Sequence, residues 1–124
     1  MTDAAAADSN IGGLFAAIDL QDSDAFVAHL AEDAVFRFGS APPVQGRVAV
    51  RAAVDAFFGT IAGLSHRVDR TLRDGDTLVC IGEVTYRRHN GGEITLPFTN
   101  VFDYDGGLIN FYGIYIDIAP LYAD

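Results

Sequence analysis

The chain of 124 residues is half hydrophobic and carries a formal net charge of -9, from 8 basic and 17 acidic side chains. This length suits a single domain with one sizeable core, and its nine Phe and five Tyr residues argue for a folded globule. A chain this acidic repels phosphate backbones and anionic lipids, so we exclude nucleic acids and membranes as partners.

The cysteine content and the first residues bear on the compartment. Cys80 is the only cysteine, so it cannot form an intrachain disulfide, and we expect a cytoplasmic protein. The opening stretch MTDAAAADSN has neither the basic start nor the long apolar segment of a signal peptide. We therefore predict a flexible leader over residues 1–8 and a single domain over residues 9–124.

The first half of the chain predicts three helices and one strand. The first helix has Ser9 as its N-cap, and its apolar positions recur at helical spacing: Ile11, Leu14, Phe15 and Ile18. A short second helix follows the stretch QDSD, and apolar spacing over residues 47–61 predicts the third. Between these two, AVFRF (34–38) favours a strand and GSAPPVQG (39–46) a loop, because two consecutive prolines lack ladder donors.

The second half of the chain predicts strands only. They cover residues 66–72, 78–87, 93–104 and 108–118, and the stretches RDGD, HNGG and DGG between them are typical of tight turns. Helices followed by an antiparallel meander indicate the α+β class, with the helices packed on one face of a curved, mostly antiparallel sheet.

Four stretches resemble the SnoaL-like, nuclear transport factor 2-like superfamily: AIDLQDSDAFVAHLAEDAVF (17–36), PPVQGRVAV (42–50), DGDTLVCIGEVTY (74–86) and DGGLINFYGIYIDIAPL (105–121). The resemblance implies a cone-shaped α+β barrel around an apolar pocket for a small hydrophobic molecule. It also implies a homodimer formed through the outer sheet face. The superfamily holds isomerases, dehydratases, cyclases, epoxide hydrolases and non-enzymes, so the fold alone does not fix the function.

Two residues match a His–Asp dyad that dehydratases of this superfamily use. Asp19 lies near the end of the first predicted helix, and His66 opens the strand after the third. The resemblance implies that His66 is a general base and that Asp19 fixes its tautomer and stabilises the cation it forms. The alternative is that His66 is a partly exposed strand residue and Asp19 a helix-terminal group.

Further residues are expected to line the pocket. Strand alternation, with the superfamily's usual orientation, places Glu83 and Thr85 on the pocket face, where Glu83 would be a second acid or base unless it pairs with an arginine. Asn100 is expected to donate to an oxyanion, and Tyr112 to donate or simply to pack. The apolar wall is expected to include Phe15, Phe36, Phe38, Phe57, Ile61, Leu96 and Phe98.

Other members' catalytic residues have no counterpart here. The general-base Asp of the ketosteroid isomerases falls on Phe38, and their Tyr falls near Leu14. The water-activating cluster of the limonene epoxide hydrolases falls on Phe36, Phe38, Glu83, Thr85 and Ile114. No paired histidine spacing suggests a metal, and no glycine loop suggests a nucleotide.

These observations favour a cofactor-independent lyase or isomerase that abstracts a proton from a small hydrophobic cyclic or carbonyl-bearing substrate. Two alternatives stay open: a non-catalytic small-molecule-binding or accessory dimer, and a polyketide-cyclase-like catalyst that works by positioning and an oxyanion donor.

Overall fold

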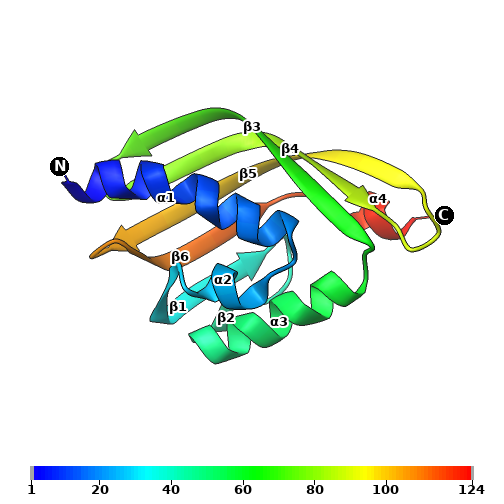
Figure 1. The fold of residues 1–124 in the computed structure, drawn as a ribbon, viewed down its shortest axis with the longest axis horizontal. Coiled ribbons are helices and arrows are strands. Elements are labelled where there is room, and N and C mark those ends of the chain that lie inside the picture. The colour runs from blue at the N-terminus through cyan, green and yellow to red at the C-terminus, as the bar shows by residue number, and fades with distance from the viewer. Residues whose placement is uncertain (1, 124) are drawn as a thin grey trace.

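A computed structural model of the chain shows helices packed on one face of a strongly bent sheet (Figure 1). It describes the backbone of residues 2–123 and the side chains of residues 11–123. The helices in that range are α1 (Thr2–Asp19), α2 (Ser23–Val27), α3 (Arg47–Gly59) and α4 (Ala119–Tyr122). The strands are β1 (Leu30–Phe38), β2 (Val44–Gln45), β3 (Gly63–Asp74), β4 (Thr77–Arg87), β5 (Glu93–Asp105) and β6 (Leu108–Tyr115).

The six strands of the described chain form one sheet in the order β2-β1-β6-β5-β4-β3. The meander from β3 to β6 is antiparallel throughout, and β1 joins it by pairing parallel to β6. The predicted α+β class with a curved, mostly antiparallel sheet is confirmed. Since β3 ends the order, one of its edges has no strand partner, and α1 lies beside it (Figure 1).

Element boundaries differ from the prediction mainly at the ends of the chain and in one loop. The helix α1 begins at Thr2, so most of the predicted leader over residues 1–8 continues the helix, and Ser9 is not its N-cap. The alanines of this stretch have the highest helix propensity of all residues, which favours such an extension. The predicted loop 39–46 contains the short strand β2, because Val44 pairs with Phe36 of β1.

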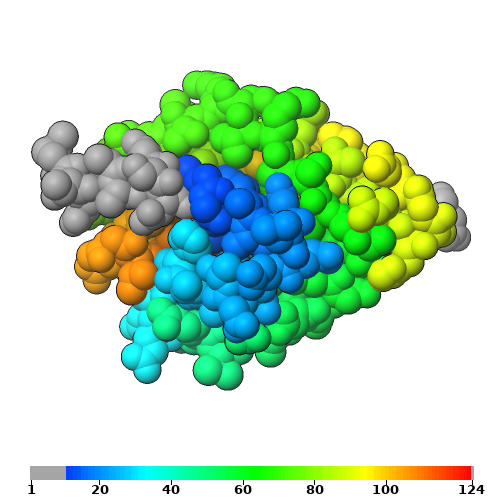
Figure 2. All heavy atoms as spheres, in the orientation of Figure 1, coloured from blue at the N-terminus to red at the C-terminus, as the bar shows by residue number. Residues whose placement is uncertain are grey.

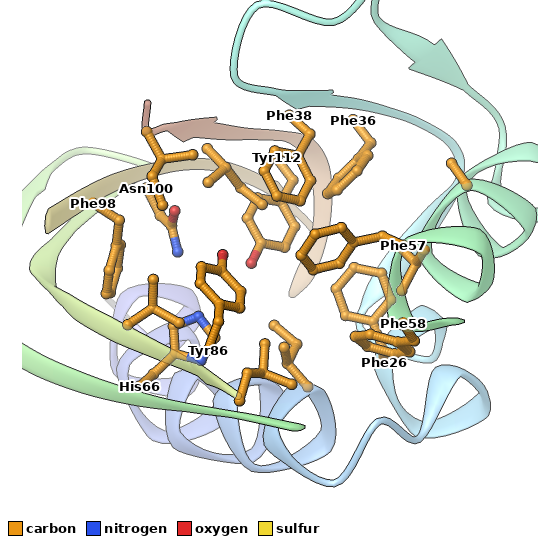
Figure 3. Close-up of a pocket in the computed structure, with 17 residues that line it drawn as sticks. Phe26, Phe36, Phe38, Phe57, Phe58, His66, Tyr86, Phe98, Asn100 and Tyr112 are labelled. Atoms are coloured by element: carbon orange, nitrogen blue, oxygen red, sulfur yellow. The ribbon is translucent and has the colours of Figure 1, made fainter. Parts of the chain in front are cut away.

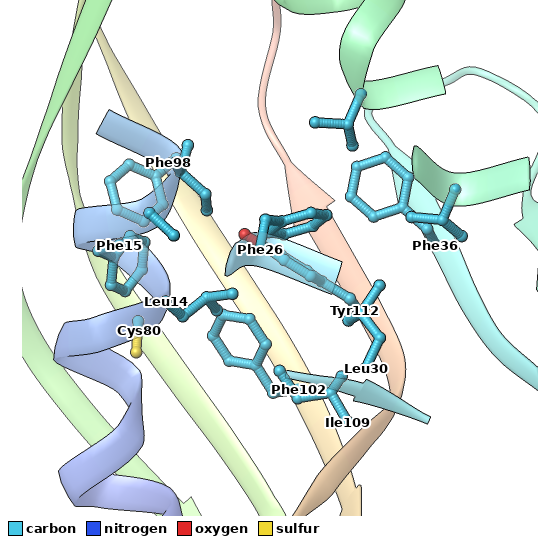
Figure 4. Packing of buried hydrophobic residues seen from close by; sticks show 14 of the residues in the cluster. Leu14, Phe15, Phe26, Leu30, Phe36, Cys80, Phe98, Phe102, Ile109 and Tyr112 are labelled. Atoms are coloured by element: carbon cyan, nitrogen blue, oxygen red, sulfur yellow. The ribbon is translucent and has the colours of Figure 1, made fainter. Parts of the chain in front are cut away.

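The core lies between the helices and the concave face of the sheet. Figure 4 shows Phe26 of α2 beside Tyr112 of β6, and these two rings are 5.8 Å apart between centroids. Tyr112 also packs on Phe102 of β5, with centroids 4.5 Å apart. These aromatic contacts tie α2 to the middle of the sheet and fix the floor of the concave face.

The concave face of β4 is the opposite of the one predicted. Leu78, Cys80, Val84 and Tyr86 are buried on the concave side, whereas the alternate positions are more exposed. The prediction that Glu83 and Thr85 face the pocket was therefore wrong. The side chain of Glu83 accepts a hydrogen bond from Arg67 at 2.7 Å, and Thr85 contacts Thr95 at 2.8 Å.

A bulge in β3 bends the sheet beside the helices. The register between β3 and β4 shifts between Val68 and Arg70, which leaves one extra residue on β3. At the same level a Cβ on Gly82 would stand 1.9 Å from the carbonyl oxygen of Arg67. The lack of a side chain at Gly82 thus allows the two strands to approach closely at the bend.

The outer surface of the helical layer is visible in Figure 2. Atoms of residues 11–30 form a band between β3 on one side and α3 on the other, so α1 and α2 cover the concave side of the sheet. None of the helices among the described residues combines the length and the apolar character needed to cross a membrane.

Candidate active site

Asp19 and His66 meet where the end of α1 touches the edge strand β3. The Oδ1 atom of Asp19 lies 2.6 Å from Nδ1 of His66, and Oδ2 accepts the backbone N–H of His66 at 3.1 Å. One carboxylate therefore holds both the ring and the main chain of the same residue. The structure brings together the two residues that the sequence analysis paired.

Local structure explains why these two residues can meet. The strand β3 is at the sheet edge, where alternate N–H groups lack a partner strand, and Asp19 satisfies one of them. The helix α1 ends at Asp19 because Gln21 adopts a left-handed conformation, with φ of 55°. The side-chain amide of Gln21 donates to the carbonyl of Phe58 at 3.2 Å, which links the end of α1 to α3.

The imidazole of His66 is enclosed by aromatic rings. Its centroid lies 5.0 Å from the ring of Phe15 on α1 and 5.3 Å from that of Phe98 on β5. The side chain of His66 is 10% exposed, against 28% for Asp19. The ring orientation is thus fixed by packing on its faces and by the carboxylate at one nitrogen.

An apolar cavity of about 50 Å³ opens in front of His66 (Figure 3). The helices α1, α2 and α3 and all the longer strands contribute to its wall, so it occupies the interior of the bent sheet. Its lining residues are Ile18, Phe26, Phe36, Phe38, Ala53, Val54, Phe57, Phe58, Leu64, His66, Val84, Tyr86, Phe98, Asn100, Tyr112, Ile114 and Ile116. Since Asp19 is absent from this lining, it contacts the imidazole from behind.

Three polar side chains join His66 in the cavity wall: Tyr86, Asn100 and Tyr112. Asn100 is only 1% exposed, and its Oδ1 atom has no hydrogen-bond partner among the described residues. Buried polar atoms almost always have a partner, so this unpaired carbonyl oxygen marks a position where a hydrogen-bond donor of a guest molecule would be bound.

The two phenols are held in their neutral form. Burial raises the pKa of Tyr86, with a smaller effect from Tyr122. Burial also raises the pKa of Tyr112, and the neighbouring Cys80 adds to this. Figure 3 shows both hydroxyl groups directed towards the middle of the cavity, so each is an O–H donor available to a bound molecule.

Most of the predicted wall residues line the cavity, but five do not. Phe36, Phe38, Phe57, Phe98, Asn100 and Tyr112 all lie in its wall. Phe15 stands behind the imidazole, and Ile61 and Leu96 are buried outside the lining. Glu83 and Thr85 lie on the convex face of β4, as described above, so the prediction that they bind substrate was wrong.

Tyr86 and Phe58 are the functional candidates that the sequence analysis missed. Because the predicted alternation placed Glu83 and Thr85 on the pocket face of β4, it placed the intervening Tyr86 on the opposite face. The positions of Glu83 and Arg87 could have corrected this, because two charged residues on one face of a strand indicate the solvent side. Phe58 follows Phe57 in α3, and both face the cavity because the last turn of that helix lies over it.

A metal site is not formed by the part of the chain that the structure describes, where no three His, Cys, Asp or Glu residues cluster closely enough to hold an ion. The polar groups of the cavity wall are one imidazole, two phenols and one carboxamide. This set suits proton transfer on an uncharged organic molecule.

Comparisons with known proteins agree on one family. A family model for the SnoaL-like domain matches residues 11–112. The chain therefore belongs to the SnoaL-like family, within the nuclear transport factor 2-like superfamily that the sequence resembled. No curated protein matches the chain in sequence.

Solved structures reproduce the whole fold at low sequence identity. An NTF2-like protein of unknown function from Burkholderia pseudomallei has a TM-score of 0.85 at 20% identity, covering 94% of each chain. A candidate polyketide cyclase from Xanthomonas campestris pv. campestris has a TM-score of 0.85 at 21% identity, covering 96% of each. An LEH-like epoxide hydrolase from M. tuberculosis has a TM-score of 0.80 at 18% identity, covering 95% of this chain and 87% of the other. The predicted cone-shaped fold is thereby confirmed.

Proposed function

We propose that this protein is a cofactor-independent enzyme of the lyase or isomerase type, which removes a proton from a small hydrophobic carbonyl-bearing substrate. One observation carries the proposal: Asp19 holds Nδ1 of His66 from outside the cavity, while the same ring lines the cavity. With the proton on Nδ1, the opposite nitrogen Nε2 has its lone pair free to act as a base.

The reaction follows from this arrangement. Nε2 of His66 takes a proton from the carbon next to the carbonyl. The electron pair of the broken C–H bond forms a carbon–carbon double bond, and the π pair of the carbonyl moves to its oxygen to give an enolate. The carboxylate of Asp19 stabilises the imidazolium that forms. Expulsion of a leaving group from the adjacent carbon then completes a lyase reaction, whereas return of the proton to another carbon completes an isomerisation.

The enolate oxygen needs hydrogen-bond donors, and the cavity wall supplies them. Asn100 has an amide group in the wall, and the phenols of Tyr86 and Tyr112 stay protonated because burial raises the pKa of each. Donors fixed in an apolar cavity stabilise developing negative charge more strongly than water-exposed donors do.

Exchange of carbon-bound protons in deuterium oxide tests the proposal without knowledge of the natural substrate. A panel of cyclic ketones, enones and β-hydroxyketones is incubated with the protein, and deuterium uptake next to the carbonyl is followed by NMR. We expect accelerated exchange for at least one compound, reduced about 10²- to 10⁴-fold in His66→Asn. Compounds that bind without exchange, or exchange that survives His66→Asn, would contradict the proposal.

Two other functions fit parts of the site. A cyclase-type catalyst gains support from the fold shared with a candidate polyketide cyclase, and it would use the donors of the wall without the base. Exchange that depends on Tyr86 and Asn100 but not on His66 would favour it. A non-catalytic binding or accessory protein would bind compounds of the panel and exchange none.

We also propose that the protein is a cytoplasmic homodimer. The lone Cys80 fits a reducing compartment. The convex face of the sheet carries apolar side chains on adjacent strands: Val79 and Ile81 on β4, Val101 on β5 and Tyr115 on β6. Tyr115 is 50% exposed in the single chain, which is unusual for a large aromatic residue with no partner.

A further inference from the structure

A second, larger cavity lies next to the candidate active site. It has a volume of about 370 Å³ and is formed where the loop after β1 passes in front of α3 and the C-terminal segment. Four residues, Phe36, Phe38, Ala53 and Phe57, line both cavities. We call the cavity at His66 the inner chamber and this one the outer chamber.

Two aromatic rings separate the chambers. Phe38 of β1 and Phe57 of α3 face each other with centroids 4.8 Å apart and planes inclined at 60°. Figure 3 shows both rings on the side of the inner chamber that lies opposite His66. Side-chain rotation about single bonds is all that is needed to part them, so a bound molecule can extend from one chamber to the other.

The inner chamber alone is too small for a ring. A cavity that encloses one benzene molecule has a volume of about 150 Å³, whereas the inner chamber has about 50 Å³. A substrate that reaches His66 must therefore displace part of the wall, and the wall that adjoins free space is the Phe38–Phe57 pair.

The outer chamber offers no partner for charge. Its lining residues are Phe36, Phe38, Ser40, Ala41, Pro42, Val44, Ala53, Phe57, Ile118 and Tyr122, none of which is ionised at neutral pH. The hydroxyl of Tyr122 contacts that of Thr60 at 3.0 Å, which anchors the C-terminal segment to the end of α3. Such a lining favours an uncharged apolar group and disfavours a phosphate or carboxylate.

We infer that the outer chamber is a second binding subsite and that the substrate is an elongated, uncharged molecule with two parts. A carbonyl-bearing head occupies the inner chamber at His66, and an apolar extension of about one ring passes between Phe38 and Phe57 into the outer chamber. This inference rests on the proposed function for the identity of the head group. The subsite itself is defined by the cavity and its lining.

The binding of three phenols tests the inference by NMR titration. Phenol presents one ring to the inner chamber, whose wall side chains must shift to admit it. 4-Phenylphenol adds an apolar ring, and 4′-hydroxybiphenyl-4-carboxylate adds a charge at the far end. We expect 4-phenylphenol to bind at least about tenfold more tightly than phenol, because its second ring is buried. We expect the carboxylate to lose most of that gain. Contacts between the second ring and the methyl groups of Val44 should appear as intermolecular nuclear Overhauser effects.

A pair of matched variants tests whether the tighter binding of 4-phenylphenol arises in the outer chamber. Ala41 is exposed and lines the outer chamber, so Ala41→Trp should fill that chamber and remove the preference for 4-phenylphenol while phenol affinity stays unchanged. Ala56 is exposed on α3 away from both chambers, and Ala56→Trp should leave both affinities as they are. Equal affinities for the two phenols in the wild-type protein, no binding of 4-phenylphenol, or an unchanged preference in Ala41→Trp would overturn the inference.

The same measurements separate this inference from the proposed function. Binding of the second ring does not require a base, so His66→Asn should keep the preference for 4-phenylphenol. If proton exchange depends on His66 but the two phenols bind with equal affinity, the proposed subsite is contradicted and the proposed enzymatic function is supported. If 4-phenylphenol binds more tightly than phenol but no compound shows proton exchange, the subsite is supported and the proposed enzymatic function is contradicted.

Discussion

The carboxylate of Asp19 has two separable effects on His66. One oxygen holds the imidazole in the tautomer that frees Nε2, and the other holds the backbone of the edge strand. An asparagine at this position keeps the shape of the side chain, but it removes the negative charge that stabilises the imidazolium. It also places an N–H donor within reach of Nδ1, which favours the wrong tautomer.

For this reason we predict that Asp19→Asn lowers the rate of proton exchange about 10²-fold or more. Its effect on the affinity for phenol should be small, because Asp19 does not line the inner chamber. Deuterium exchange measures the first quantity and NMR titration the second. Asp33→Asn, an exposed carboxylate on β1, is the matched control and should change neither. Equal rates in Asp19→Asn and the wild type would show that the carboxylate only anchors the strand.

At the scale of the elements, β4 and β6 bring Tyr86 and Tyr112 to the cavity. Burial of these two phenols makes the stability of the fold depend on pH. Burial raises the pKa of each phenol above its ordinary value of 10.0. A raised pKa means that the folded state favours the neutral phenol. The contribution to stability is complete below pH 10, where both states are protonated, and is lost as the pH rises beyond it and the unfolded state ionises.

We therefore predict that the free energy of unfolding falls steeply above pH 10, and that the fall is smaller in Tyr112→Phe. Urea unfolding at a series of pH values between 8 and about 11.5 provides the measurement. Tyr115→Phe is the matched control, because Tyr115 is half exposed on the same strand. An identical pH dependence in Tyr112→Phe and Tyr115→Phe would mean that the buried phenol does not cause the loss.

The order of elements could be predicted from the sequence because each signal was local. Helical spacing around Leu14 and the Asp-Gly turn at Asp74–Gly75 each depend on a few neighbouring residues. The orientation of β4 could not be obtained in this way, since alternation defines two faces but not which one is covered. Glu83 and Arg87 on one face were the signal for the solvent side, and the apolar Val79 and Ile81 on that face masked it.

The residues of the candidate site likewise include some that could be predicted from the sequence and some that could not. Asp19 and His66 could be paired because their positions, near the end of the first helix and at the start of the strand after the third, match a dyad that dehydratases of the resembled superfamily use. The pocket role of Tyr86 could not, because it depends on the curvature of the sheet and on the orientation of β4. The two chambers are also beyond sequence reasoning, since Phe38 and Phe57 would have the same apolar pattern in a filled core.

At the scale of the whole molecule, the convex face of the sheet is unusually apolar, with residues such as Ile81 and Val101 opposite the cavity. A sheet covered by helices on one side exposes alternate residues to water on the other, and these are normally polar. Here Leu72, Val79 and Val101 stand at one level of three adjacent strands, with Gly113 of β6 beside them. Burial of this row against a second copy would remove an apolar surface from water.

We thus predict that the wild-type protein is a dimer and that Ile81→Asp shifts it to a monomer, because a carboxylate buried in a symmetric interface faces its own copy. Light scattering after size-exclusion chromatography measures the mass directly. Val48→Asp places the same charge on a residue that is 86% exposed at the start of α3, and it should remain dimeric. Since the cavity opens away from the convex face, the Ile81→Asp monomer should still bind 4-phenylphenol. A wild-type monomer, or a dimer that survives Ile81→Asp, would show that the convex face is not the interface.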